Sequence, residues 1–141
     1  MYSIVILGVP NPQKRPRFAR MGRFVKTFDP DKSLKKDIIE GFTGQLPDTL
    51  ISTPIRVEAR FYFPHRTSHY RSNGTLKDKS FIKSTKPDLD NLIKFILDTL
   101  NGVIWVDDSL IVELVAGKYY DEKPRTELYI RSYEDNERTE N

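Results

Sequence analysis

The sequence predicts a single α+β domain in which two helices pack against one small mixed sheet, in the order β-α-β-α-β-β. Three observations predict this class. The 141 residues are enough for one domain with one core. Apolar residues alternate with polar ones between Pro54 and Pro64, which is typical of a half-buried strand, and they recur at helical spacing after Pro87. We expect the domain to cover residues 1–133.

The N-terminal part of the chain predicts a strand, a basic arm and a helix. Residues 2–9 are apolar and end at a Pro-Asn-Pro breaker, which indicates a buried strand. Residues 13–28 show no periodicity and contain several basic residues but no acidic one, since the first acidic residue of the chain is Asp29. We therefore expect a basic loop or arm. Asp29-Pro30 resembles a helix start, and apolar residues recur at every fourth position from Leu34, which predicts a helix from about residue 30 to 43.

The remaining elements follow from the same patterns. Residues 65–87 have loop chemistry and form a second basic segment. A stripe of apolar residues from Leu89 to Leu100 predicts an amphipathic helix that ends at Asn101-Gly102. Residues 110–120 and 126–131 are β-like, and residues 134–141 are expected to be a charged, disordered tail.

The charge distribution is more informative than the net charge of +3. Residues 1–87 carry 17 Lys/Arg and 7 Asp/Glu, whereas residues 88–141 carry 6 and 13. A basic surface favours a polyanion such as nucleic acid, and an acidic cluster beside it favours bound cations. Two solvated charged faces explain the composition equally well, so the position of the charges must decide.

Other features of the composition narrow the class of protein. The absence of cysteine excludes a disulfide framework and a thiolate metal site. No apolar run approaches the 18 or more residues of a membrane span, and residues 2–9 lack the basic start and cleavage site of a signal peptide. We therefore expect a cytoplasmic protein without a membrane partner.

Four aspartates are candidates for a metal site. Asp88 and Asp90 flank Leu89 at the start of the second predicted helix, and Leu89 alone belongs to its buried stripe. The pair Asp107-Asp108 follows after a stretch long enough to return to that helix. Three such carboxylates held together would repel by about 4 kcal/mol per pair at roughly 4 Å. Mg²⁺, or Mn²⁺, would offset this repulsion and leave positions open for substrate phosphates.

Lys94 lies one helical turn after Asp90 and could contact a scissile phosphate or protonate a leaving group. Each of these residues also has a purely structural interpretation. Asp88 could be a helix cap, Asp90 and Lys94 could form an ordinary i,i+4 pair, and Asp107-Asp108 could be turn residues. Trp105 is most simply a core aromatic. The functional interpretation therefore depends on the joint pattern.

That joint pattern resembles the RusA family of Holliday-junction resolvases, which is common in phages and prophages. The resemblance lies in residues 86–94 (KPDLDNLIK), in Asp107-Asp108 with the residues that follow, and in the basic residues 12–17 (PQKRPR). It covers about residues 3–131. It departs from some members, which have a run of arginines immediately before the first aspartate where this chain has Lys83, Lys86 and Pro87.

The resemblance implies a magnesium-dependent endonuclease that acts as a homodimer on four-way DNA junctions in recombination and repair. It implies that Asp88, Asp90 and Asp108 hold the metal and that Lys94 is also required for cleavage; only the resemblance selects Asp108 over Asp107. Two alternatives are a junction-binding module with little cleavage and a metal-dependent nuclease for another DNA structure. The residues expected to bind DNA are Lys14, Arg15, Arg17, Arg20, Arg23, Lys83 and Lys86.

Overall fold

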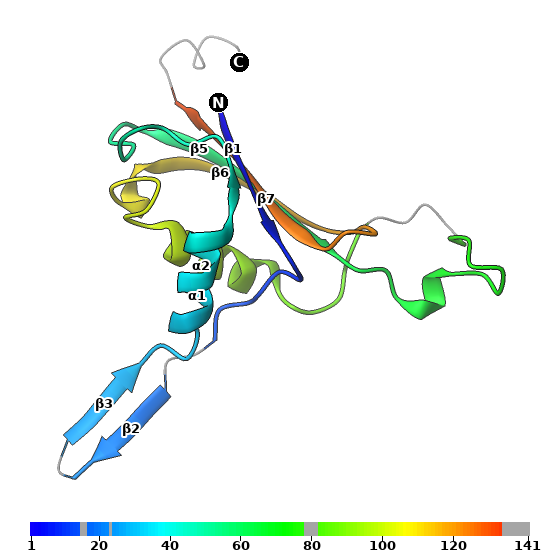
Figure 1. Ribbon diagram of the computed structural model, residues 1–141, viewed down its shortest axis with the longest axis horizontal. Helices are drawn as coiled ribbons and strands as arrows, with labels where there is room; N and C mark the ends of the chain where they lie inside the picture. The colour runs from blue at the N-terminus through cyan, green and yellow to red at the C-terminus, as the bar shows by residue number, and fades with distance from the viewer. Residues whose placement is uncertain (15–16, 23, 78–81, 134–141) are drawn as a thin grey trace.

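A five-stranded mixed sheet lies at the centre of the protein and carries two helices on one face, as the computed structural model shows (Figure 1). The structure describes residues 1–14, 17–22, 24–77 and 82–133. Strand β5 is parallel to β6, and the other neighbouring strands are antiparallel. The predicted α+β class is confirmed. The strands follow each other across the sheet in the order β4 (Thr43–Gly44), β1 (Tyr2–Leu7), β7 (Arg125–Ser132), β5 (Ile55–Phe63) and β6 (Ile111–Tyr120).

The hydrophobic core lies between the sheet and helix α2 (Leu89–Leu100). Every second residue of β5, from Ile55 to Phe63, is buried, as the alternation predicts. Leu92, Ile96 and Leu100 of α2 are buried against this face. Full burial of such a side chain stabilises the fold by about 1.5–3 kcal/mol, so this stripe fixes which edge of α2 remains exposed.

The first helix is shorter than its pattern predicts. Helix α1 covers Lys32–Gly41 rather than residues 30–43. It ends because Phe42 adopts an extended conformation, with φ −71° and ψ 154°, and leads directly into β4. The short strand β4 pairs with β1 and is absent from the predicted order.

The basic arm is a hairpin, which corrects the expectation of a loop without regular structure at residues 13–28. Strands β2 (Arg17–Met21) and β3 (Phe24–Phe28) pair only with each other and project from the body of the protein (Figure 1). Apolar alternation arises where one face of a strand packs on a core, and a hairpin outside the main sheet lacks this requirement. Gly22, with φ +64°, lies in its turn.

The remaining segments connect these elements. Residues 64–88 form a long connection that contains only the short 3-10 helix η1 (Thr67–His69) among its described residues. A second 3-10 helix, η2 (Asp108–Leu110), leads from α2 into β6. None of the helices in the described ranges has the length and apolar character needed to cross a membrane. Residues 134–141, predicted to be a tail, lie outside the described residues.

Candidate active site at helix α2

Asp88 occupies the N-cap position of α2, but its side chain makes no capping hydrogen bond. Its main chain is extended, with φ −69° and ψ 142°, and its main-chain oxygen accepts from the amide of Leu92 at 3.3 Å. The side chain is exposed. The carboxylate therefore lies beside the positive end of the helix dipole without serving the helix as a cap.

Asp90 and Lys94 lie on the exposed edge of the same helix. Lys94 Nζ is 3.9 Å from Asp90 Oδ2, and both side chains are about two-thirds exposed. An exposed i,i+4 pair of this length contributes only a few tenths of a kcal/mol. Neither group is therefore held strongly by the other, and both are accessible to a ligand.

The two neighbouring aspartates before β6 have different surroundings. Asp107 accepts a hydrogen bond from the amide of Ser109 at 3.1 Å and caps η2. Hydrogen bonds from the Ser109 hydroxyl and amide hold the pKa of Asp107 below its ordinary value. Asp108 Oδ1 instead accepts a 2.6 Å hydrogen bond from Nε1 of Trp105, a residue with no exposed surface. Asp107 thus has the turn role, and Asp108 is anchored to the core.

One hollow on the surface brings two of these groups together. Its lining includes Lys94 and Asp108, together with Gln13 from the segment after β1. The main-chain amide of Gln13 donates to the main-chain oxygen of Asn91 at 2.9 Å, which fixes this segment against the first turn of α2. The side-chain oxygen of Gln13 is buried and has no hydrogen-bond partner among the described residues. Sequence reasoning missed Gln13, because an isolated glutamine in a basic loop carries no pattern.

The three aspartates do not form one compact group. In the described ranges, no three acidic or histidine side chains lie close enough together to hold a metal ion by themselves. Asp88 precedes Lys94 by six residues, or about 9 Å along the helix axis. The structure therefore places Lys94 and Asp108 at one hollow, Asp90 beside Lys94, and Asp88 at the beginning of the helix.

The donor set nevertheless fits a hard divalent cation. The candidate aspartates supply carboxylate oxygens, and the hollow adds the unpartnered side-chain oxygen of Gln13 and the carboxylate of Asp98, which is hydrogen-bonded to Lys35. Among the described residues, the lining of the hollow contains no sulfur or imidazole ligand. Mg²⁺ is usually bound through one or two carboxylates, with water and substrate phosphates completing its octahedron. Two of these aspartates and a substrate phosphate would meet that requirement.

The residues expected to bind DNA have different positions. Lys14 is exposed, and its Nζ lies 3.7 Å from Asp31 Oδ1. Lys86 is exposed immediately before Pro87, whereas Lys83 is buried, with 7% of its surface exposed. Arg15 and Arg23 lie outside the described residues, and Arg17 and Arg20 belong to β2.

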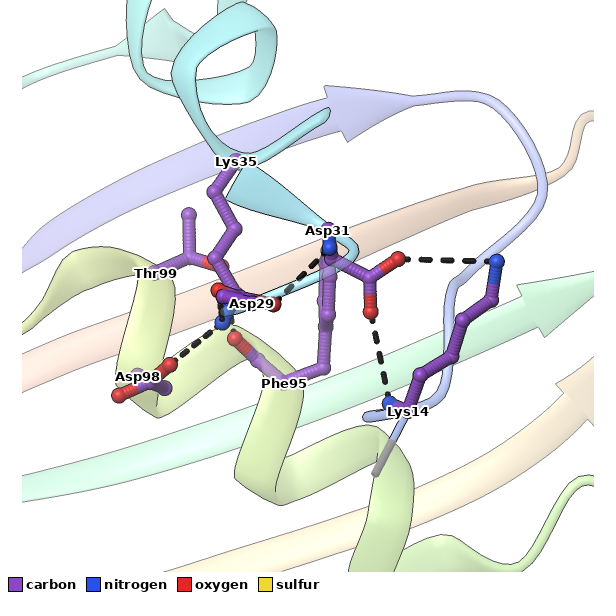
Figure 2. A network of polar contacts seen from close by, with 7 residues as sticks. All are labelled: Lys14, Asp29, Asp31, Lys35, Phe95, Asp98 and Thr99. Carbon is purple, nitrogen blue, oxygen red and sulfur yellow. Dashed lines mark hydrogen bonds and ion pairs between the residues drawn. The ribbon is translucent and has the colours of Figure 1, made fainter. Parts of the chain in front are cut away.

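A network of charged side chains, which the sequence patterns did not predict, is centred on the buried Lys35 and Asp31 and joins the base of the hairpin to both helices (Figure 2). Lys35 Nζ is only slightly exposed and donates to Asp29 at 2.8 Å and to Asp98 of α2 at 2.5 Å. It also lies 5.7 Å from the centre of the Phe95 ring. Asp31, 3% exposed, accepts from the amide of Lys14 at 3.4 Å. These contacts fix both ends of the hairpin relative to the helix that carries Asp90 and Lys94.

Two comparisons with known proteins give matches over most of the chain, and the family model supplies the classification. The model of the family described as "Endodeoxyribonuclease RusA" matches residues 8–131. The chain is 34% identical over 134 residues to the uncharacterized protein YqaN of Bacillus subtilis strain 168, and this match covers 92% of the chain and 94% of the relative. The matched residues include both α2 and η2, and hence every aspartate discussed above.

Proposed function

Since the chain belongs to the RusA family of endodeoxyribonucleases, we propose that it is a divalent-metal-dependent enzyme that resolves four-way DNA junctions. The observation that carries this proposal is the exposed edge of α2 and the adjoining hollow. Asp88 and Asp90 are exposed and have no strong partner among the described residues, and Lys94 shares a hollow with Asp108. Exposed carboxylates are suited to a divalent cation, and an exposed lysine beside them is suited to a phosphate. Together they favour a polyanion such as DNA that binds with a metal ion.

In this proposal, Asp88, Asp90 and Asp108 would supply the carboxylates that hold a Mg²⁺ or Mn²⁺ ion at the DNA backbone. When bound, the ion would activate a water and neutralise charge on the transferred phosphoryl group and leaving oxygen. Trp105 orients Asp108 by its indole hydrogen bond. Lys94, exposed and one turn from Asp90, binds the scissile phosphate or donates the proton that the leaving oxygen requires.

The basic segments on either side of this helix would bind the flanking DNA backbone. Residues 14–23 of the sequence supply Lys14, Arg15, Arg17, Arg20 and Arg23, and the connection to α2 supplies Lys83 and Lys86. One chain provides one set of aspartates, whereas resolution of a four-way junction requires two cuts in opposing strands. The proposal therefore includes a homodimer with two active sites.

The test uses a synthetic mobile four-way junction and a linear duplex of the same sequence, each incubated with purified protein in Mg²⁺, in Mn²⁺ and in EDTA. We expect paired, symmetric nicks in the junction only, and none in EDTA. The variant Asp90→Asn should bind the junction without cutting it, because the amide retains the shape of the side chain and removes its charge.

Two results would overturn the proposal. Junction binding without cutting in any divalent ion would favour a DNA-binding module. The separation of the three aspartates is compatible with that alternative. Cutting of flaps or single strands in preference to junctions would indicate a nuclease for a different DNA structure. Sedimentation of the complex with the junction measures the number of chains bound, which the proposal sets at two.

A further inference from the structure

Three cationic side chains converge on Thr85, three residues before Asp88. Arg66 Nη2 and Lys83 Nζ each donate to the hydroxyl oxygen of Thr85 at 2.9 Å. Lys118 Nζ, from β6, donates to the main-chain oxygen of Thr85 at 2.8 Å. These contacts gather three positive charges, from segments far apart in the sequence, around one neutral residue.

No acidic side chain offsets these charges within the described parts of the chain, where none of the three cations forms an ion pair. Charged side chains are seldom buried without a partner of opposite charge. Such a cluster is therefore suited to an anionic ligand.

The buried member of the cluster is Lys83, which is 7% exposed. Its ammonium group lies 4.9 Å from the centre of the Phe63 ring and 5.1 Å from that of Tyr120, and ring faces of this kind attract a cation. The Tyr120 hydroxyl also reaches Thr85, at 3.4 Å. The aromatic rings hold the charge of Lys83 beneath the surface, while Arg66 and Thr85 are exposed and Lys118 is half-buried.

The cluster is also connected to the candidate active site. Lys118 Nζ makes a second hydrogen bond, 2.9 Å, to the main-chain oxygen of Pro87, the residue before Asp88. Three residues of extended chain span at most about 11 Å, and phosphates of one DNA strand recur about every 3.4 Å along the duplex axis. A strand with one phosphate at the aspartates would thus bring a nearby phosphate to the cluster.

We propose that Arg66, Lys83 and Lys118 form a binding site for one phosphate of the DNA backbone, adjacent to the phosphate that is cut. This assignment rests on the proposed function and adds residues to it. Arg66 and Lys118 contact the phosphate through the donors that Thr85 and Pro87 do not use. Lys83, which is buried beneath the surface, contributes positive charge to the site without contacting the phosphate directly.

The test measures affinity for a labelled four-way junction in EDTA, where no cutting occurs, over a series of salt concentrations. Log affinity falls linearly with log salt, and each phosphate contact that is lost makes this negative slope shallower by about 0.9. We expect a slope shallower by up to this amount for Arg66→Met and for Lys118→Met, together with binding that is several-fold weaker at low salt. Lys118→Arg, which keeps the charge, should retain the slope of the unchanged protein.

Lys36→Met is the matched control, because Lys36 is exposed on α1 and has no assigned role. Its slope should equal that of the unchanged protein. If Arg66→Met and Lys118→Met lower only the thermal midpoint and leave the slope unchanged, the cluster serves to attach the connection to the sheet and the phosphate site is wrong. The affinity measurement needs no cleavage. Failure to cut in Mg²⁺ would therefore refute the proposed function, whereas the salt dependence of binding would still test the phosphate site.

Discussion

The indole nitrogen of Trp105 donates a 2.6 Å hydrogen bond to Oδ1 of Asp108, and this bond connects a fully buried core residue to the candidate active site. A buried indole N–H requires an acceptor, and here the acceptor is a carboxylate on the surface. The geometry of Asp108 is therefore set by the packing of the core. Asp107, whose partner is Ser109 two residues later, has no such connection to the core among the described residues.

Replacement of Trp105 by phenylalanine should impair metal binding more than folding. Trp105→Phe keeps an aromatic ring in the core but removes the N–H donor. The hydrogen bond that is lost joins a donor to a charged group, and such bonds contribute about 1.5–3 kcal/mol. We expect weaker Mn²⁺ binding by calorimetry and a roughly tenfold or greater loss of cleavage. Trp105→Phe with unchanged Mn²⁺ affinity would show that this hydrogen bond does not orient a ligand.

The pair Asp107-Asp108 offers a direct comparison of two adjacent carboxylates. Asp108→Asn should reduce cleavage at least a hundredfold at saturating Mg²⁺, because Asp108 is a proposed metal ligand and loss of a ligand affects the chemical step. Asp107→Asn should retain cleavage within a few-fold, since its carboxylate caps η2. Single-turnover rates on a four-way junction measure both. Equal losses for the two variants would contradict the assignment of the turn role to Asp107.

The Lys35 network predicts a pH dependence of stability with a defined sign. The hydrogen bond from Lys35, followed by that from the amide of Asp31, holds the pKa of Asp29 below its ordinary value of 3.8. A lowered pKa stabilises the folded state above the unfolded value, and this contribution is lost as the pH falls through the folded pKa. Burial opposes the charge of Lys35, but bonds to Asp29 and Asp98 outweigh it and raise its pKa above 10.5.

The difference in stability between the unchanged protein and Lys35→Met should therefore be largest between about pH 5 and pH 9, at roughly 1–2 kcal/mol. It should shrink below about pH 4, as Asp29 is protonated, and again above pH 10.5, as Lys35 loses its proton. Urea unfolding at a series of pH values measures it. Lys36→Met, an exposed neighbour, should show no such profile, and a pH-independent difference for Lys35→Met would exclude the ion pairs as its cause.

The sequence predicted those elements whose residues pack on the core. The alternation in β5 and the stripe of α2 reflect burial on one face, so both were located to within a residue. The β2–β3 hairpin was missed because its strands pair only with each other, outside the main sheet. Strand β4 has only two residues, too few for any period.

In the candidate site too, some residues could be predicted from local sequence patterns and others could not. The spacing of Asp88, Asp90 and Lys94 follows from their helix and could be predicted, although their roles remain a prediction. Gln13, Lys35 and Lys118 could not be found in this way, because their partners are distant in the sequence. Lys35, for example, precedes its partner Asp98 by 63 residues. Contacts of this kind depend on how the elements pack, which no local pattern encodes.

The edge of the sheet at β4 has no room for a side chain at Gly44. Gly44 has φ +142°, and a Cβ atom there would lie 2.1 Å from the main-chain oxygen of Ser3 in β1. Neither the backbone conformation nor the space accepts a side chain, so Gly44→Ala must displace β4 from β1. We expect a loss of about 1–3 kcal/mol, seen as a thermal midpoint lower by several degrees.

Gly41→Ala is the control three residues earlier, because Gly41 ends α1, has nothing within 4 Å of an added Cβ and no positive φ. It should be neutral or slightly stabilising, since alanine favours a helix more than glycine does. Because β4 covers the edge of β1, Gly44→Ala should also expose unpaired main-chain groups there and increase aggregation on heating. Equal midpoints for the two variants would show that β4 contributes nothing to the stability of the sheet.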